Sequence, residues 1–111
     1  MKIKTLLVTA SVFVGLSLGN AFAAEAQQNY EKHCMKCHGK DGKGATKMGR
    51  QSGAKDYTDP KVQAELKDES AIKAIRGGMK ENGKEKMKPY GGELSDDEIR
   101  ALVAYMRAFK K

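Results

Sequence analysis

Two thiols stand three positions apart in the run Cys34-Met35-Lys36-Cys37-His38, and an imidazole follows them directly. This spacing is the attachment signature of c-type haem. The two sulfurs can add across the two vinyl groups of a haem, while the imidazole can bind the iron through one ring nitrogen. We therefore predict that Cys34 and Cys37 attach one haem c covalently and that His38 is the proximal axial ligand of its iron.

A Cys-x-x-Cys pair alone has other uses, because it also occurs in dithiol redox switches, zinc sites and short disulfides. A structural zinc site needs four ligands, and the only other Cys or His in the chain is His33, in the same short stretch. A thioredoxin-like dithiol needs a βαβ context that the rest of the chain does not offer. These remain the alternatives, and His38 is the residue that favours haem over them.

The second axial ligand is expected from a methionine in a loop. Met87 begins the stretch 87–92, whose proline and two glycines cannot continue a helix and can present a side chain from a shaped loop. A thioether is a soft, uncharged donor that favours reduced iron. We predict Met87 as the distal axial ligand and Met79 as the second candidate for that role. The alternative is that Met87 only fills a gap in the core. The methionines that fit less well are Met1, Met35, Met48 and Met106.

The first residues predict a secretory signal peptide over 1–23. Two lysines among the first four residues precede a largely apolar stretch, and Ala21-Phe22-Ala23 supplies the small-x-small cleavage pattern. The apolar stretch at 6–18 is shorter than the ~20 residues that a spanning helix needs, so a retained anchor is the second choice. We expect a periplasmic protein without stable membrane insertion, whose single domain is residues 24–111.

The mature chain is small and basic. Removal of 23 residues from 111 leaves 88, enough for one domain with a thin core that a tethered haem would help to fill. The whole chain has a formal net charge of +7, and loss of the two leader lysines would lower it to +5. The lysines are scattered among acidic residues without an aromatic platform, which argues against nucleic acid.

The basic charge predicts acidic redox partners, since a positive field around an exposed redox centre steers an acidic protein toward it. We expect a monomer that meets them transiently. The lysines that flank the two predicted iron-binding segments are Lys36, Lys40, Lys43, Lys86 and Lys88.

The clearest predicted helix is the last one. Ser95 and Glu98 match a capping box, and apolar residues then recur at three- and four-residue steps almost to the end of the chain. A first helix is predicted over about 25–37, with Tyr30 and Cys34 on its inner side.

Glycines after the Cys-x-x-Cys-His run predict a turn and then an irregular segment to about Tyr57. A short helix is expected from Pro60, capped by Asp59. A third helix, capped by Asp68 or Ser70, should end at Gly77-Gly78 and be followed by about fifteen residues of loop. No segment alternates as a strand.

In this order of motifs, the chain resembles a small soluble bacterial monohaem cytochrome c of class I, from about residue 25 to residue 110. The resemblance implies an all-α fold of three to five short helices wrapped around one covalently bound haem. It implies that the first and last helices cross, with Tyr30 against Leu102 and Tyr105. It also implies a one-electron shuttle with His/Met ligation rather than an enzyme.

Two departures from this family are visible, because the chain has no tryptophan and no proline between Gly39 and Asp59. The carbonyl that would accept the Nδ1 proton of His38 cannot therefore be named from the sequence. The candidates for contacts to the haem propionates are Arg50, Gln51, Lys55 and Tyr57.

Other functions differ from the electron shuttle in one property each. A peroxidase or gas-binding sensor needs an open iron site, so Met87 would not bind. A permanent subunit of a larger oxidoreductase would share every motif and differ only in copurification. The near match to a phosphate loop at 78–85 lacks the final hydroxyl and the preceding strand, so nucleotide binding is not indicated.

Overall fold

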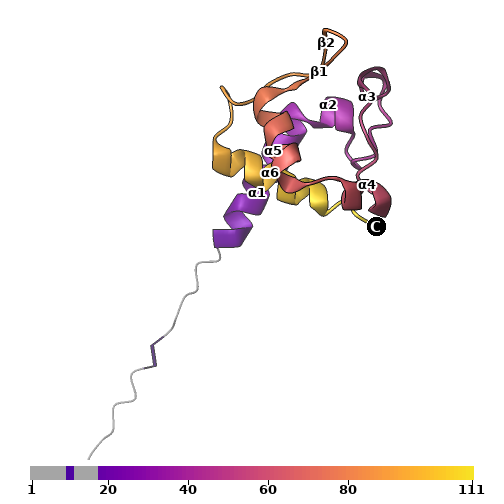
Figure 1. Cartoon of the computed structure of the whole chain (residues 1–111). Coiled ribbons are helices and arrows are strands. Elements are labelled where there is room, and N and C mark those ends of the chain that lie inside the picture. The colour runs from indigo at the N-terminus through magenta and orange to yellow at the C-terminus, as the bar shows by residue number, and fades with distance from the viewer. Residues whose placement is uncertain (1–9, 12–17) are drawn as a thin grey trace, which may run out of the picture.

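The structure, a computed structural model, describes residues 10–11 and 18–111 (Figure 1). Most of the predicted signal peptide lies outside these residues. The first helix, α1, begins at Leu18 and runs through the predicted cleavage position at Ala23. No helix within the described ranges is long and apolar enough to cross a membrane.

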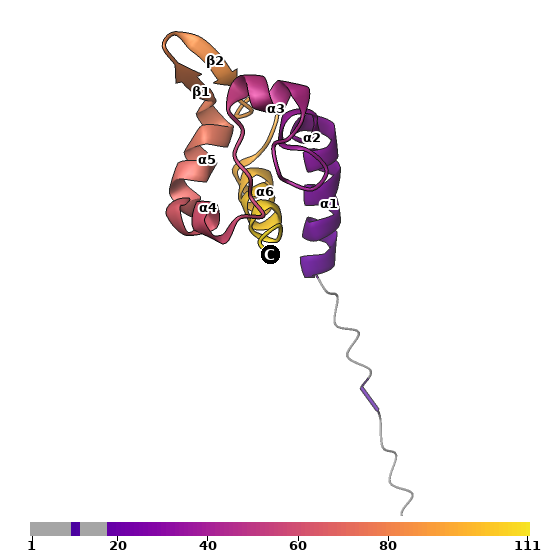
Figure 2. The ribbon, with the colours of Figure 1, turned by 90° about the vertical axis from the view of Figure 1, so that its right-hand side faces the viewer.

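The described chain is mostly helical, with one small antiparallel sheet (Figures 1 and 2). The helices are α1 (Leu18–His33), α2 (Met35–His38), α3 (Lys47–Ser52), α4 (Pro60–Glu65), α5 (Asp68–Gly77) and α6 (Asp96–Arg107). The strands are β1 (Met79–Glu81) and β2 (Lys84–Met87).

The packing of α1 against α6 forms the centre of the core, as predicted for the first and last helices. Tyr30 of α1 and Leu102 of α6 are fully buried. The Tyr30 ring also meets the Tyr105 ring, with centroids 5.0 Å apart and planes tilted by 40°. Aromatic pairs in this range add roughly 0.5–1.5 kcal/mol to the burial of their area.

Two predicted helix starts are confirmed in atomic detail. Ser95 caps α6: its hydroxyl accepts from the Glu98 N–H at 3.1 Å, and the Glu98 carboxylate accepts from the Ser95 N–H at 3.0 Å. Asp59 caps α4 by accepting from the Lys61 N–H at 2.9 Å, with Pro60 in the first turn. The chain therefore enters both helices where its side chains satisfy free N–H groups.

The helix boundaries near the Cys-x-x-Cys-His run differ from the prediction. The expected helix over 25–37 is divided, because α1 ends at His33 and the single turn α2 begins at Met35. The segment predicted to be irregular contains α3, which Thr46 caps by accepting from the Gly49 N–H at 2.8 Å. With these two extra short helices, six are present in the described residues rather than three to five.

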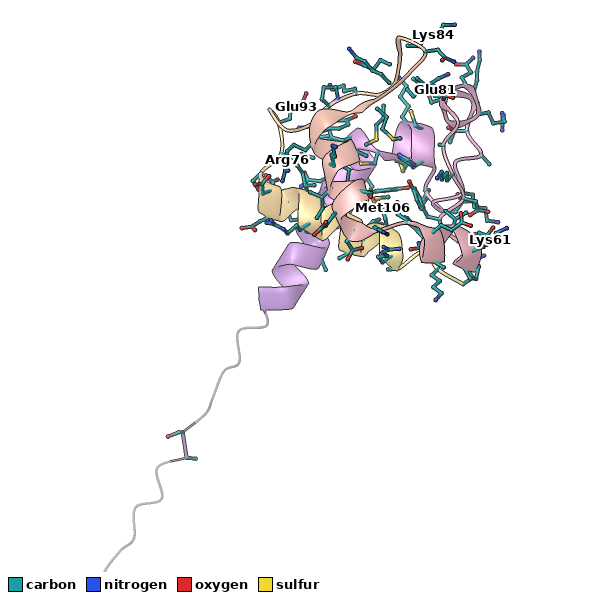
Figure 3. All side chains as sticks on the ribbon, viewed as in Figure 1. Lys61, Arg76, Glu81, Lys84, Glu93 and Met106 are labelled. Atoms are coloured by element: carbon teal, nitrogen blue, oxygen red, sulfur yellow. The ribbon has the colours of Figure 1, made fainter. Side chains whose placement is uncertain are left out.

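The prediction of loop after Gly78 and of no strand was wrong. Strands β1 and β2 form a hairpin whose turn, Asn82-Gly83, has φ values of 51° and 77°. Two positive φ values suit a tight hairpin turn, and Asn-Gly is the sequence best adapted to it. The hairpin projects from the helical body, and Figure 3 shows Lys84 near its far end.

Helix α5 ends at Gly77 with Gly78 as its C-cap, as predicted. Its start differs, because Lys67 is the N-cap and makes no side-chain cap bond, while Asp68 lies in the first turn. The Asp68 carboxylate instead accepts from Arg107 of α6 at 2.8 and 2.9 Å.

A buried amide joins α4 to α6, and no sequence pattern predicted it. Gln63 is 6% exposed, and its Nε2 donates to the carbonyls of Tyr57 at 2.7 Å and Met106 at 3.0 Å. Its Oε1 accepts from Arg107 at 2.9 Å. Because every polar atom of this amide is paired, it fixes the position of α4 without an unsatisfied buried group.

Candidate haem-binding site

The Cys-x-x-Cys-His run occupies one helical turn at the end of α1. The N–H groups of Cys37 and His38 both donate to the Cys34 carbonyl, at 3.3 and 2.9 Å. Cys34 is buried, Cys37 and His38 are half-buried, and both cysteines are free thiols. Residues three and four apart share one side of a helical turn. The structure therefore brings the two thiols and the imidazole together, as the sequence predicted.

Three hydrogen bonds from outside the run fix its backbone. The buried Tyr30 hydroxyl donates to the Gly39 carbonyl at 2.6 Å. The Thr46 hydroxyl donates to the Cys37 carbonyl at 2.7 Å, and the Gly44 N–H donates to the His38 carbonyl at 2.8 Å. The carbonyls that a short helix leaves free are thus paired with α1 and with the glycine loop.

Gly49 sets how closely α3 approaches this turn. A Cβ added at Gly49 would overlap the carbonyl oxygens of Cys37 and Gly44, which are backbone atoms and cannot turn aside. We expect Gly49→Ala to lower the free energy of unfolding of the haem-loaded protein by about 1–3 kcal/mol, the usual cost of overpacking. Denaturant unfolding followed by helical circular dichroism measures it.

The matched control is Gly77→Ala, since nothing lies within 4 Å of an added Cβ at Gly77. This change should be neutral or slightly stabilising, because alanine favours a helix more than glycine does. Equal stability of the Gly49 and Gly77 variants would contradict the close packing of α3 on the Cys-x-x-Cys-His turn.

The pKa of the Cys34 thiol does not match a dithiol switch. Burial, and secondly the neighbouring Cys37, raise the pKa of the Cys34 thiol to about 11. Redox-active Cys-x-x-Cys pairs work in the opposite way, by lowering the pKa of their nucleophilic thiol. Cys34 therefore remains a protonated thiol at neutral pH, which disfavours the redox-switch alternative.

The imidazole of His38 is kept neutral. Burial lowers its pKa, so the ring retains a free lone pair, the form in which histidine binds metals. Its Nδ1 is buried and has no hydrogen-bond partner among the described protein atoms. Buried polar atoms without partners are rare in proteins, and no carbonyl of the described residues accepts a proton from Nδ1 of His38.

Tyr57 is the one predicted propionate candidate that approaches the site, and it does so beside the proximal imidazole. It is 9% exposed, and its ring centroid lies 5.5 Å from that of His38. Arg50 donates to the Ala45 carbonyl at 2.9 Å. Arg50, Gln51 and Lys55 are all exposed side chains.

The distal candidate, Met87, lies at the end of β2. It is half-buried and packs against the core cluster that also contains Cys34. Its partner across the hairpin is Met79, which is 53% exposed. The hairpin thus places the two candidate ligands side by side. Met87 packs on the core, whereas Met79 is exposed to solvent.

Two other methionines and the second histidine differ in their surroundings. Met106 is buried in the core on α6, and Met48 is 40% exposed on α3. His33 lies at the end of α1, its Nδ1 3.7 Å from the Glu93 carboxylate. Across residues 10–11 and 18–111, no group of three His, Cys, Asp or Glu side chains could hold a metal ion, so zinc has no ligand set there.

The donor set fits a haem. Two thiols on one turn suit covalent attachment to two vinyl groups, while a neutral imidazole and a thioether are a known pair of axial ligands to haem iron. A helical fold that holds such a turn at the junction of its first helix and a glycine loop is the architecture of a c-type haem protein.

Comparison with known proteins leads to the same class. The family model described as Cytochrome c matches residues 23–110. The solved structure "KustC0563 c-type cytochrome" is 37% identical, with a TM-score of 0.70 over 78% of this chain and 98% of that chain. A solved point mutant of Kustc0563 is 35% identical, with a TM-score of 0.68 over 78% of this chain and 99% of that chain. Comparison with curated proteins found no match.

The chain therefore belongs to the cytochrome c family. It is a small monohaem cytochrome c that carries a covalently bound haem c with its iron, and its role is haem-based electron transfer. The sequence prediction of the fold and of the cofactor is confirmed.

Proposed function

We propose that this cytochrome is a periplasmic one-electron shuttle and not an enzyme, with its haem attached at Cys34 and Cys37 and its iron ligated by His38 and Met87. The observation that supports this most is the anchored turn, which presents both thiols and a neutral imidazole from one rigid segment. The apolar leader over 1–23, which ends in a small-x-small pattern, supports export.

When bound, the haem supplies a metal centre that gains and loses one electron. The protein's own part is to hold that centre in one geometry. His38 would donate a nitrogen lone pair from a ring that packs against Tyr57. Met87 offers a thioether from the core side of the hairpin. With both residues bound, the iron would have no open site for substrate, and the rearrangement that accompanies each electron would be small.

The direct test is the visible spectrum of the protein recovered from the periplasmic fraction. Sharp ferrous low-spin bands and the weak ferric band of methionine ligation are the expected result. A high-spin ferric spectrum, with carbon monoxide binding readily to the reduced protein, would instead identify an open-site enzyme or sensor. Recovery only in the cytoplasmic fraction would contradict the proposed location.

Acidic redox proteins are the proposed partners. The five lysines near the predicted ligands lie on α2, on the glycine loop and at the end of the hairpin, and four of them are exposed. Lys86 is half-buried on β2. Lys88 already forms an ion pair with Glu93 at 3.0 Å, so part of its charge is neutralised within the molecule.

We expect the double substitution Lys86→Gln/Lys88→Gln to slow oxidation by hexacyanoferrate(III), an anionic stand-in for an acidic partner. At low ionic strength the rate should fall by about three- to tenfold, and added salt should remove the difference. Stopped-flow absorbance of the haem band measures it.

The matched control is Lys61→Gln/Lys67→Gln, which removes the same charge from exposed positions on and after α4. Figure 3 shows Lys61 at the opposite end of the body from the hairpin. Equal rates for the two double variants would show that net charge alone acts and that no face near the ligands is preferred.

A further inference from the structure

The loop that follows Met87 is tied to the end of α1 by one side chain. The Tyr90 hydroxyl donates to the His33 carbonyl at 2.9 Å, across 57 positions of sequence. His33 is the last residue of α1 and directly precedes Cys34. Tyr90 lies three residues after Met87. This hydrogen bond therefore joins the backbone beside the attachment motif to the backbone beside the distal ligand.

The accepting carbonyl is free because α1 stops there. In a continuous helix the Cys37 N–H would donate to the His33 carbonyl, but it donates to Cys34 instead, at 3.3 Å. A carbonyl at a helix end needs another partner, and the Tyr90 hydroxyl supplies it. The break between α1 and α2 thus creates the attachment point for the distal loop.

The rest of the loop is held to α5. The Tyr90 N–H donates to the Ile75 carbonyl at 2.9 Å, and the Gly91 N–H donates to the Arg76 carbonyl at 3.0 Å. The backbone runs so close to this helix end that a Cβ on Gly78 would lie 2.6 Å from the Met87 carbonyl oxygen. These bonds fix the loop to α5, whereas the Tyr90 hydroxyl bond fixes it to the backbone of α1.

Side-chain contacts hold the tyrosine ring in place. The His33 ring packs edge-on to it, with centroids 5.3 Å apart, and Lys88 Nζ lies 5.3 Å above it. Lys88 and His33 both approach the Glu93 carboxylate, at 3.0 and 3.7 Å. Figure 3 shows Glu93 on the same side of the body as Arg76. A ring confined in this way loses little freedom when its hydroxyl forms the bond.

We propose that Tyr90 is a positioning residue for the distal ligand: its hydroxyl fixes the Met87 loop to the end of α1 and so holds the thioether over the metal. This inference rests on the proposed function, in which Met87 ligates the iron. Without the hydroxyl the loop keeps its bonds to α5 but can move away from α1. The thioether then competes less well with an external ligand.

The test is Tyr90→Phe in the haem-loaded protein, which removes the hydroxyl and keeps the ring contacts. Ferric protein is titrated with imidazole, and loss of the weak methionine band marks displacement of Met87. The variant should need about three- to tenfold less imidazole than wild type, the range expected from one hydrogen bond. An unchanged titration midpoint would overturn the proposal.

A control separates positioning from general stability. Asp59→Ala removes the cap of α4 but keeps the Tyr90 hydroxyl bond, and should lower the unfolding temperature without moving the imidazole midpoint. An equal shift of the midpoint in Asp59→Ala would overturn the positioning role. A wild-type protein with no methionine band would instead contradict Met87 ligation itself, so the two failures are distinguishable.

Discussion

Replacement of both cysteines, Cys34→Ala/Cys37→Ala, is expected to yield a chain that retains no haem after denaturation. Thioether bonds survive denaturing conditions, whereas a haem held by axial ligands alone does not. The measurement is haem staining of a denaturing gel together with the mass of the intact polypeptide. The wild-type band should stain and carry the added mass, and the double variant should show neither.

Met35→Leu is the control for this substitution, because Met35 lies between the two thiols and packs against the same core. It should keep covalent haem at the wild-type level. Stained haem in the double alanine variant would show that attachment takes place elsewhere and would remove the basis of the proposed site. Loss of haem in Met35→Leu would point instead to a general failure of folding.

The same double substitution should also lower stability severely. The core centres on a few fully buried side chains, Tyr30, Ile99 and Leu102, in a chain of only 111 residues. Chains of this size gain little from apolar burial alone and depend on an added group. We therefore expect the double variant to lose most of its helical circular dichroism at 37 °C, while Met35→Leu retains it.

The starts of α4 and α6 could be predicted because neighbouring residues alone form their helix caps. The capping box at Ser95 and the Asp59-Pro60 pair are complete within three or four residues, so no tertiary knowledge was needed. The attachment motif is equally local, because its chemistry depends on spacing alone. These local signals explain why the fold class followed from the sequence, whereas α3 and the hairpin, which hold the attachment turn and Met87, were not predicted.

Two kinds of feature were not predicted, and the first kind depends on contacts far apart in the sequence. Gln63 is buried only because Arg107, on another helix, completes its hydrogen bonds. The division of the first helix near Cys34 likewise depends on Thr46 and Tyr90, which bind carbonyls on either side of it. The second kind is local: the Asn82-Gly83 turn indicates the hairpin, and the Thr46 cap indicates the start of α3.

The hairpin gives Met87 a different structural setting from the predicted one. Met87 was predicted to project from a loop, yet it ends a strand, and its register sets it opposite Met79. A register shift lies between Met79 and Lys80, so the pairing alone does not say which of the two methionines faces the core. What separates them is burial, since Met87 packs on the core and Met79 is 53% exposed.

Met87→Ala is therefore expected to remove the weak ferric band of methionine ligation and to open the distal side of the iron. Loss of a thioether removes the ligand that favours the ferrous state, so the reduction potential should fall. We expect a fall on the order of 100 mV or more, within the roughly 0.8 V that axial ligands span. Visible spectroscopy and a spectroelectrochemical titration of the haem-loaded protein measure both effects.

The matched control is Met79→Ala, which removes the same side chain from the opposite position in the hairpin. It should leave the methionine band and the potential close to wild type, because a side chain that faces solvent contributes little to the iron environment. Carbon monoxide should bind rapidly to reduced Met87→Ala and slowly to reduced Met79→Ala. If Met79→Ala loses the band and Met87→Ala keeps it, the thioether comes from β1 and the hairpin presents its other strand to the metal.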